Sequence, residues 1–274
     1  MAIAIDSQLV PQSGDALSPT KQTNFVDRSS IVRRIWGDPD LVLLIFAGSA
    51  AEFALNRSVD WLFFTGEIPR DPIGRLFSTV RYAQDIVFVD EEKALRTLAR
   101  INAQHSHVEN ERQQTIPDWA YRDVLYMLID YSERAHELLY RPLSDLEKAD
   151  LFAVFLRIGE GLHVKQLPKT YSEWQVDRQL HLLRDLSYGK YTEMLFQSYR
   201  RQLGVLRYEL LLQVQALLVP HHVRRLLRLR PNLIISGLVD TYGVIRSLRL
   251  QSVVHGLLIP PRHWDDVRKF DRRV

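Results

Sequence analysis

Apolar residues recur at helical spacing along almost the whole chain from Ser30 onward, and this pattern constrains the fold more than any other feature. Residues three and four positions apart share one face of a helix, so the pattern predicts amphipathic helices. No segment shows sustained alternation of apolar and polar residues bounded by hairpin turns, which is typical of half-buried strands. We therefore predict an all-α fold, a single globular bundle of roughly eight to ten helices.

Capping residues place the starts of several predicted helices. Asp71 precedes Pro72, which is the usual order of an N-cap and a first helical residue. Ser144 and Glu147 have the spacing of a capping box. The predicted helices span residues 31–36, 41–55, 73–88, 90–109, 118–140, 144–159, 173–186, 192–203, 205–218 and 231–250, and residues 57–70 are predicted to be irregular.

Length and composition fit one large core. A chain of 274 residues with 46% apolar residues can bury such a core without covalent staples. The chain has no cysteine, which excludes disulfides, thiolate metal sites and cysteine nucleophiles. Residues 1–28 are polar and contain Pro11, Gly14 and Pro19, so we predict a disordered or loosely docked arm followed by one domain over residues 29–274.

Charge and hydropathy patterning limit the classes of partner and the cellular location that we expect. A net charge of +3 is too small for a dedicated nucleic-acid binder. The first 20 residues have no basic segment before their apolar residues, so no secretory signal is expected. The longest apolar run, residues 41–55, is interrupted by Glu52 and is shorter than the roughly 20 residues that a membrane span needs. We expect a cytoplasmic protein with no transmembrane segment.

His105 is the first candidate site residue. It shares a helix face with Leu98, Ile101 and Val108, whereas His107 points about 160° away from that face. A histidine that faces a core needs a partner for each ring nitrogen. Two interpretations stay open, a core histidine hydrogen-bonded to its surroundings and a metal or haem ligand.

Arg75 and Thr79 are the second candidate pair. They lie one helical turn apart on the helix that Asp71 opens, and Tyr82 continues their face. The functional interpretation is a cation and a hydroxyl that face one cavity. The structural interpretation is an arginine that reaches solvent or an acidic neighbour.

Two further patterns have a structural explanation as well as a functional one. Glu133/His136 and Glu160/His163 have the Glu-x-x-His spacing of di-iron helical bundles, but the turn after Arg141 offsets the pairs by roughly 18 Å. The basic stretch 221–230 has no wide apolar stripe, so a solvated helix face explains it better than a membrane surface. Phosphate-binding loops and hydrolase motifs are absent from the sequence.

Four short motifs in order carry a family resemblance. Residues 71–79 read Asp-Pro-x-x-Arg-x-x-x-Thr, and His105 is followed by x-x-Val. Pro-Leu-Ser begins at Pro142, and Leu-Pro-x-Thr-x-x-Glu begins at Leu167. Over about residues 40–220 the chain resembles the latex-clearing protein (rubber oxygenase) family, which includes the oxygenase of mycophenolic acid biosynthesis.

The resemblance implies an all-α fold with haem b buried between helices. It implies that His105 is the axial iron ligand and that Arg75 and Thr79 line the haem cavity as catalytic and cofactor-binding residues. The chain departs from the family pattern at several positions. Ser78 replaces a lysine, Leu125 replaces a second histidine, and the family's Gly-Gly and Gln-x-x-His-Pro region is reduced to Gly48-Ser49 and Glu52-Phe53-Ala54-Leu55-Asn56.

Two hypotheses on function follow. The first is a haem-dependent oxygenase-like oxidoreductase whose small apolar substrate, isoprenoid or lipid-like, contacts the aromatic segment 61–64. That segment has a competing interpretation as plain core. The second hypothesis is a non-catalytic helical binding or scaffold protein that has lost the haem site, which Ser78 and Leu125 motivate.

Overall fold

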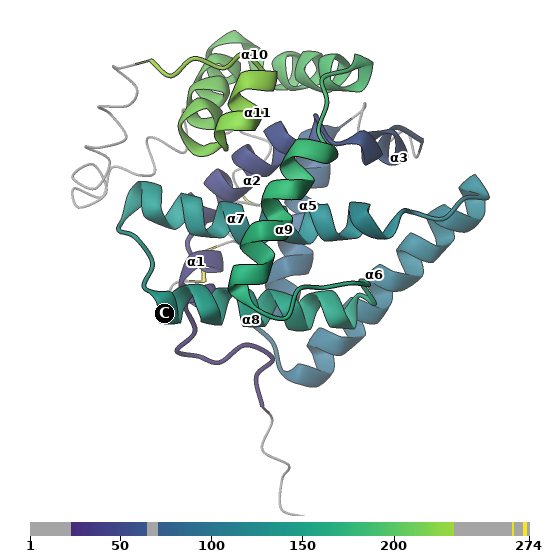
Figure 1. Ribbon diagram of the computed structural model, residues 1–274, viewed down its shortest axis with the longest axis vertical. Coiled ribbons are helices and arrows are strands. Elements are labelled where there is room, and N and C mark those ends of the chain that lie inside the picture. The colour runs from purple at the N-terminus through teal and green to yellow at the C-terminus, as the bar shows by residue number, and fades with distance from the viewer. Residues whose placement is uncertain (1–22, 65–70, 233–264, 266–270, 273–274) are drawn as a thin grey trace, which may run out of the picture.

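The computed structural model describes residues 23–64, 71–232, 265 and 271–272, and this part of the chain is helical (Figure 1). Within it, extended backbone pairs only in two isolated bridges, Asn24 with Asp90 and Asn56 with Leu186. The predicted all-α fold is confirmed. The elements are α1 (Ile31–Trp36), α2 (Pro39–Phe53), the 3-10 turn η1 (Arg57–Val59), α3 (Asp60–Phe64), α5 (Pro72–Val87), α6 (Glu91–Arg112), α7 (Asp118–Leu139), α8 (Asp145–Gly161), α9 (Tyr171–Arg184), α10 (Lys190–Leu218) and α11 (His221–Leu226).

The caps that the sequence indicates begin these helices. The Asp71 carboxylate accepts the N–H of Gly74 at 3.0 Å and caps α5. Ser144 and Glu147 form both bonds of the capping box at the start of α8. These local bonds satisfy backbone donors that the first helical turn leaves free, so helix starts can be predicted without tertiary contacts.

Several predicted boundaries differ from the structure. Residues 57–64, predicted to be irregular, form η1 and α3, because the Asn56 side chain accepts the N–H of Ser58 and starts a helical turn. Thr170 rather than a later residue caps α9, which therefore begins at Tyr171. The predicted helix 231–250 lies almost entirely outside the described residues.

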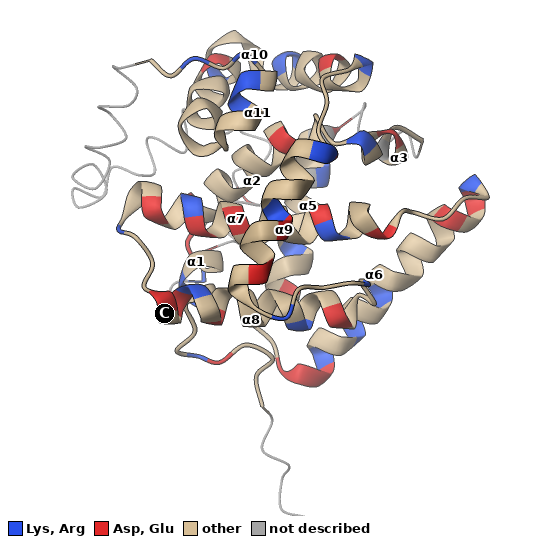
Figure 2. Cartoon of the chain, viewed as in Figure 1, with Lys and Arg blue, Asp and Glu red and all other residues tan. Residues whose placement is uncertain are grey.

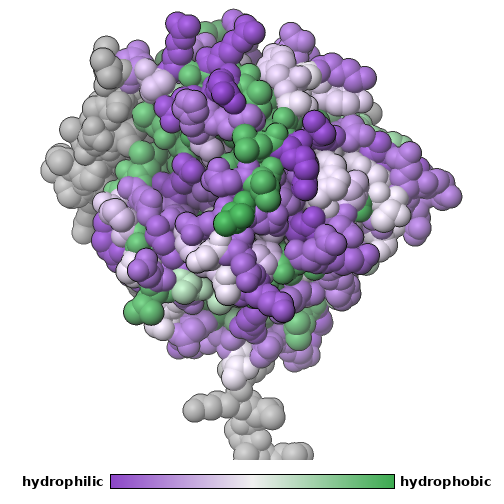
Figure 3. Space-filling view, in the orientation of Figure 1, coloured by the Kyte–Doolittle hydropathy of each residue, from purple (hydrophilic) through white to green (hydrophobic). Residues whose placement is uncertain are grey.

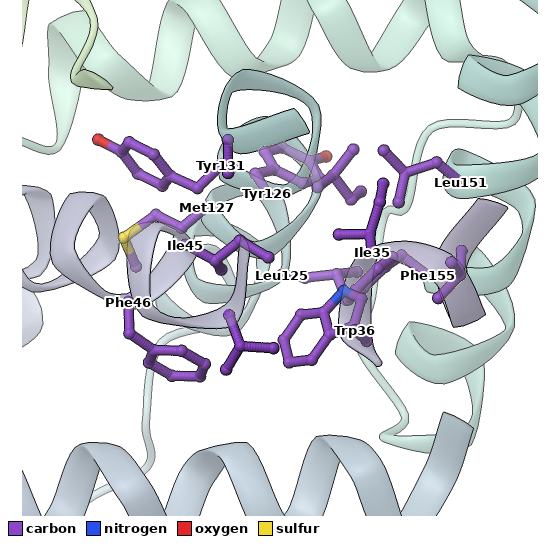
Figure 4. Packing of buried hydrophobic residues seen from close by; sticks show 14 of the residues in the cluster. Ile35, Trp36, Ile45, Phe46, Leu125, Tyr126, Met127, Tyr131, Leu151 and Phe155 are labelled. Carbon is purple, nitrogen blue, oxygen red and sulfur yellow. The ribbon is translucent and has the colours of Figure 1, made fainter. Parts of the chain in front are cut away.

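The core centres on α2, which packs along α7. Trp36, at the end of α1, lies between Phe46 and Phe155, with ring centroids 6.1 Å and 5.9 Å apart (Figure 4). Its indole N–H donates to the hydroxyl of Ser132 on α7 at 3.2 Å. The packing of α1, α2, α7 and α8 around one indole sets the positions of the helices that carry the candidate site.

Residues 23–28, the described part of the predicted arm, contact the helices. Phe25 and Val26 are buried, and the backbone N–H of Phe25 donates to the carbonyl of Val89 at 3.2 Å. The guanidinium of Arg157 lies 4.4 Å from the centre of the Phe25 ring. Residues 1–22 lie outside the described part, and the division of the chain after residue 28 stays a prediction.

Helix α9 crosses the face of the molecule shown in Figure 1. Its outer side exposes Val176, Leu180 and Leu183, and Figure 3 shows hydrophobic residues in the middle of this face. Its inner side carries charged residues, described below. No helix among the described residues is both long and apolar enough to cross a bilayer.

Candidate functional site

His105 lies on α6 where this helix faces α7. The side chain is half-buried, and its ring centroid is 5.1 Å from that of Tyr121 at an interplanar angle of 58°. His107 points the other way, with 72% of its side chain exposed and Nε2 3.4 Å from Glu111. The structure therefore separates the two histidines as their spacing predicts.

The surroundings of His105 favour the neutral imidazole. Burial lowers the pKa of His105, the Glu109 carboxylate opposes this, and the Arg75 guanidinium on α5 lowers the pKa further. Among the described residues neither ring nitrogen of His105 makes a hydrogen bond. Glu109 is held in place because its carboxylate accepts the N–H of Ile116 at 2.8 Å and the hydroxyl of Tyr121 at 3.4 Å. A neutral, half-buried imidazole is the form that ligates metals.

Arg75 and Thr79 occupy one face of α5. Arg75 is an exposed residue, and its charge contributes to lowering the pKa of His105. The Thr79 hydroxyl donates to the carbonyl of Arg75 at 3.1 Å, and that of Ser78 donates to the same carbonyl at 2.7 Å. Both hydroxyls are therefore engaged by their own helix.

The aromatic segment 61–64 lies between α6 and α10 rather than inside the main core. The Arg112 guanidinium lies 4.0 Å from the Trp61 ring centre and pairs with Asp60 at 2.6 Å. Phe63 packs against Tyr191 with centroids 4.5 Å apart, and 48% of Phe64 is exposed. The interpretation of this segment as plain core is therefore wrong for Phe64.

The two Glu-x-x-His pairs do not form a common site. Glu133 binds the Lys148 ammonium at 2.6 Å and the Tyr171 hydroxyl at 2.7 Å. His136 Nδ1 is 3.1 Å from the carbonyl of Arg141, whereas His163 is exposed. No group of potential metal ligands among the described residues includes either pair.

A buried ion-pair cluster lies between α2, α7 and α9, here termed the Arg178 cluster (Glu52, Asp130, Tyr131, Arg134 and Arg178). Arg178 binds both carboxylate oxygens of Glu52, at 2.6 Å and 2.7 Å, and Asp130 at 2.9 Å. The Tyr131 hydroxyl donates to Glu52 at 2.9 Å, and Arg134 binds Asp130 at 2.7 Å. The Arg178 guanidinium holds the pKa of Asp130 below its usual value, although burial alone would raise it.

A second cluster lies about one helical turn further toward the C-terminal end of α9. It is here termed the His181 cluster and consists of Asn56, Asp123, Asp177, His181, Arg184 and Asp185. The Nδ1 of His181 contacts Asp123 closely and is 3.1 Å from an oxygen of Asp185. The Asn56 amide donates to Asp123 at 2.7 Å. Figure 2 shows residues of both charges on α7 and α9 in the middle of the molecule.

Sequence reasoning missed both clusters, although a spacing signal was present. Asp177, His181 and Asp185 lie at i, i+4 and i+8, so they share one face of the predicted helix 173–186. This signal was hidden because the same helix also has apolar residues at helical spacing on its outer side, Val176, Leu180 and Leu183. The partner residues on α2 and α7 are 48 to 126 residues distant in sequence.

Two positions in the segment that departs from the family pattern belong to these clusters. Glu52 is part of the Arg178 cluster, and Asn56 is part of the His181 cluster. Leu125, at the position of the family's second histidine, is buried against Gly159, where an added Cβ would lie 2.7 Å from a Leu125 methyl carbon. An apolar contact with Gly159 therefore fills this position.

Comparison with known proteins identifies one similarity. A family model described as "ER-bound oxygenase mpaB/B'/Rubber oxygenase, catalytic domain" matches residues 33–242, which are 210 of the 274 residues. The match includes both helices of the His105 site and all residues of the two buried clusters. No curated protein and no solved structure matches the chain.

Proposed function

The chain belongs to the mpaB/B′ and rubber oxygenase catalytic-domain family, and on that premise we propose that it is a haem b-dependent oxygenase-like oxidoreductase. The observation that carries the proposal is the half-buried imidazole of His105, which burial keeps neutral and which lies within electrostatic range of Arg75. A neutral imidazole is the required form of a histidine that ligates haem iron.

The residues around His105 fit a haem ligand. His105 would hold the iron, and Tyr121 packs against its ring and limits its rotation. Arg75, on the neighbouring helix α5, supplies a positive charge that suits a haem propionate or a reduced oxygen species. When bound, haem supplies the dioxygen chemistry, and the protein sets access and electrostatics.

The substrate class follows from the aromatic segment beside α6. Trp61, Phe63 and Phe64 gather large apolar surface between α6 and α10, and Phe64 is partly exposed. Such a surface suits a small apolar substrate, isoprenoid or lipid-like, better than a polar metabolite. A cytoplasmic location stays a prediction, and the family description names ER-bound members.

The test is an absorption spectrum of the protein purified from haem-supplemented cells. We expect a Soret band with near one haem per chain, which His105→Ala loses or shifts because the variant lacks the imidazole that would hold the iron. His107→Ala is the matched control, two residues away on the exposed face of α6. Full haem content in His105→Ala would overturn the assignment of the ligand.

One observation favours the non-catalytic alternative. Leu125 is packed against Gly159, and the Ser78 hydroxyl is bound to its own helix, so neither position supplies an uncommitted polar group. This alternative predicts a colourless wild-type protein under the same conditions. A colourless wild type that is folded by circular dichroism would therefore replace the oxygenase proposal with a binding or scaffold role.

A further inference from the structure

The His181 cluster has the composition of a metal site that is separate from His105. Asp123, His181 and Asp185 are each at most 4% exposed, and each offers one ligand atom within 4.8 Å of the others. Among the described residues this is the one such group. We propose that the His181 cluster binds a divalent transition-metal ion through His181 Nδ1 and one carboxylate oxygen each of Asp123 and Asp185.

The spacing of the donor atoms suits a metal ion. His181 Nδ1 and the Asp185 oxygen are 3.1 Å apart, and two donors at this separation, each about 2.1 Å from a shared ion, subtend about 95° at it. The Asp123 oxygen approaches the same nitrogen from α7. Three donors from two helices thus lie within 4.8 Å of one another.

The groups behind the donors match the outer shell of metal sites. Metal-ligating carboxylates are usually held by further hydrogen bonds, and the second nitrogen of a ligating histidine usually faces a carboxylate or carbonyl. Asn56 donates to the other oxygen of Asp123 at 2.7 Å, and Arg184 binds both oxygens of Asp185. Asp177 lies 3.7 Å from His181 Nε2 and accepts a hydrogen bond from the Tyr126 hydroxyl at 2.7 Å. The Arg184 guanidinium lies 3.3 Å from the same nitrogen, so this exposed side chain would turn away from Nε2 when Nδ1 binds the ion.

The net negative charge of the cluster also favours a bound cation. Three carboxylates, Asp123, Asp177 and Asp185, face the single guanidinium of Arg184. A divalent ion with a neutral imidazole balances this charge, whereas a proton on His181 leaves one negative charge in excess. Uncompensated charge is costly where side chains are buried, as Asp123 and Asp185 are.

The donor set indicates the class of ion and its role. One imidazole nitrogen with carboxylate oxygens suits Zn²⁺, Mn²⁺ or Fe²⁺ rather than Ca²⁺ or Cu⁺. The ligands are buried, so the ion would be structural. It would join the C-terminal turn of α9 to α7 in a chain that has no cysteine for disulfides.

The test is calorimetric titration of the chelator-treated full-length protein with Zn²⁺ and, separately, Mn²⁺. We expect about one ion per chain, a higher unfolding temperature with the ion, and at least about tenfold weaker binding in the isosteric variant Asp185→Asn. His136→Gln is the control, because His136 is also buried but has no carboxylate at hydrogen-bond distance. It should bind as the wild type does.

Two results would overturn the proposal. One is a folded wild type that binds neither ion, which would make the cluster a protonated histidine between carboxylates. The other is equal binding by wild type and Asp185→Asn, which would place the ion on surface histidines. If Asp185→Asn does not fold, Asn56→Ala, which removes the hydrogen bond to Asp123 together with the cap of η1, tests the same site. Repeating the titration with His105→Ala separates this site from the haem proposal, because binding should persist there.

Discussion

At the scale of single residues, close contacts decide which side chains the core accepts. Gly48 on α2 lies against Tyr131 on α7, and a Cβ at this position would come within 2.3 Å of the tyrosine ring. Tyr131 is fully buried and its hydroxyl is bound to Glu52, so the ring cannot move aside. A glycine at position 48 is therefore needed for α2 and α7 to pack this closely.

We predict that Gly48→Ala lowers the free energy of unfolding by about 3 kcal/mol, because the added methyl group overlaps a fixed ring. Chemical denaturation of both proteins measures this difference. Gly189→Ala is the control, since nothing lies within 4 Å of its added Cβ, and it should cost about 0.5 kcal/mol. A similar loss in both variants would contradict the close-contact explanation.

At the scale of elements, helix starts and interruptions were largely predictable. The predicted helices 192–203 and 205–218 form one element, α10, with a kink at Gly204, which has φ 74° and ψ 171°. This backbone conformation is essentially restricted to glycine. The predicted interruption is confirmed, although the two parts continue as a single kinked helix.

We predict that Gly204→Ala destabilises the protein by about 2 kcal/mol, although no atom lies near its Cβ, because the cost arises in the backbone. Val205→Ala, at the next and exposed position, should stay within about 0.5 kcal/mol of the wild type. Thermal unfolding followed by circular dichroism compares the three proteins. A neutral Gly204→Ala would show that the kink is not needed for the fold.

At the scale of the whole molecule, the two buried clusters connect segments that are far apart in sequence. Arg178 on α9 joins Glu52, which is 126 residues away, to Asp130, which is 48 residues away. The cluster thus ties α2, α7 and α9 through charges in addition to their apolar packing. Removal of one partner from such a cluster leaves the other charges buried without compensation.

We predict that Arg178→Met costs about 4 kcal/mol of stability, because it leaves the buried Glu52 carboxylate without a cation and Asp130 with Arg134 alone. Urea denaturation measures the loss, and adding Glu52→Gln to the same protein should recover part of it. Arg96→Ala, which removes an exposed pair with Glu92, should cost less than about 0.5 kcal/mol. Equal effects of Arg178→Met and Arg96→Ala would contradict the role of the cluster.

The sequence by itself determined the helical class, most helix boundaries and the family, because apolar periodicity, caps and short motifs are local signals. It also placed His105 on the inner face of α6 and His107 on the outer face. Only the tertiary structure decided that Arg75 lies within electrostatic range of His105 and that Leu125 packs against Gly159. It also decided that Asp123 lies beside His181 and Asp185. The physical reason is that burial and charge pairing depend on which helices pack together, and spacing along one helix does not contain that information.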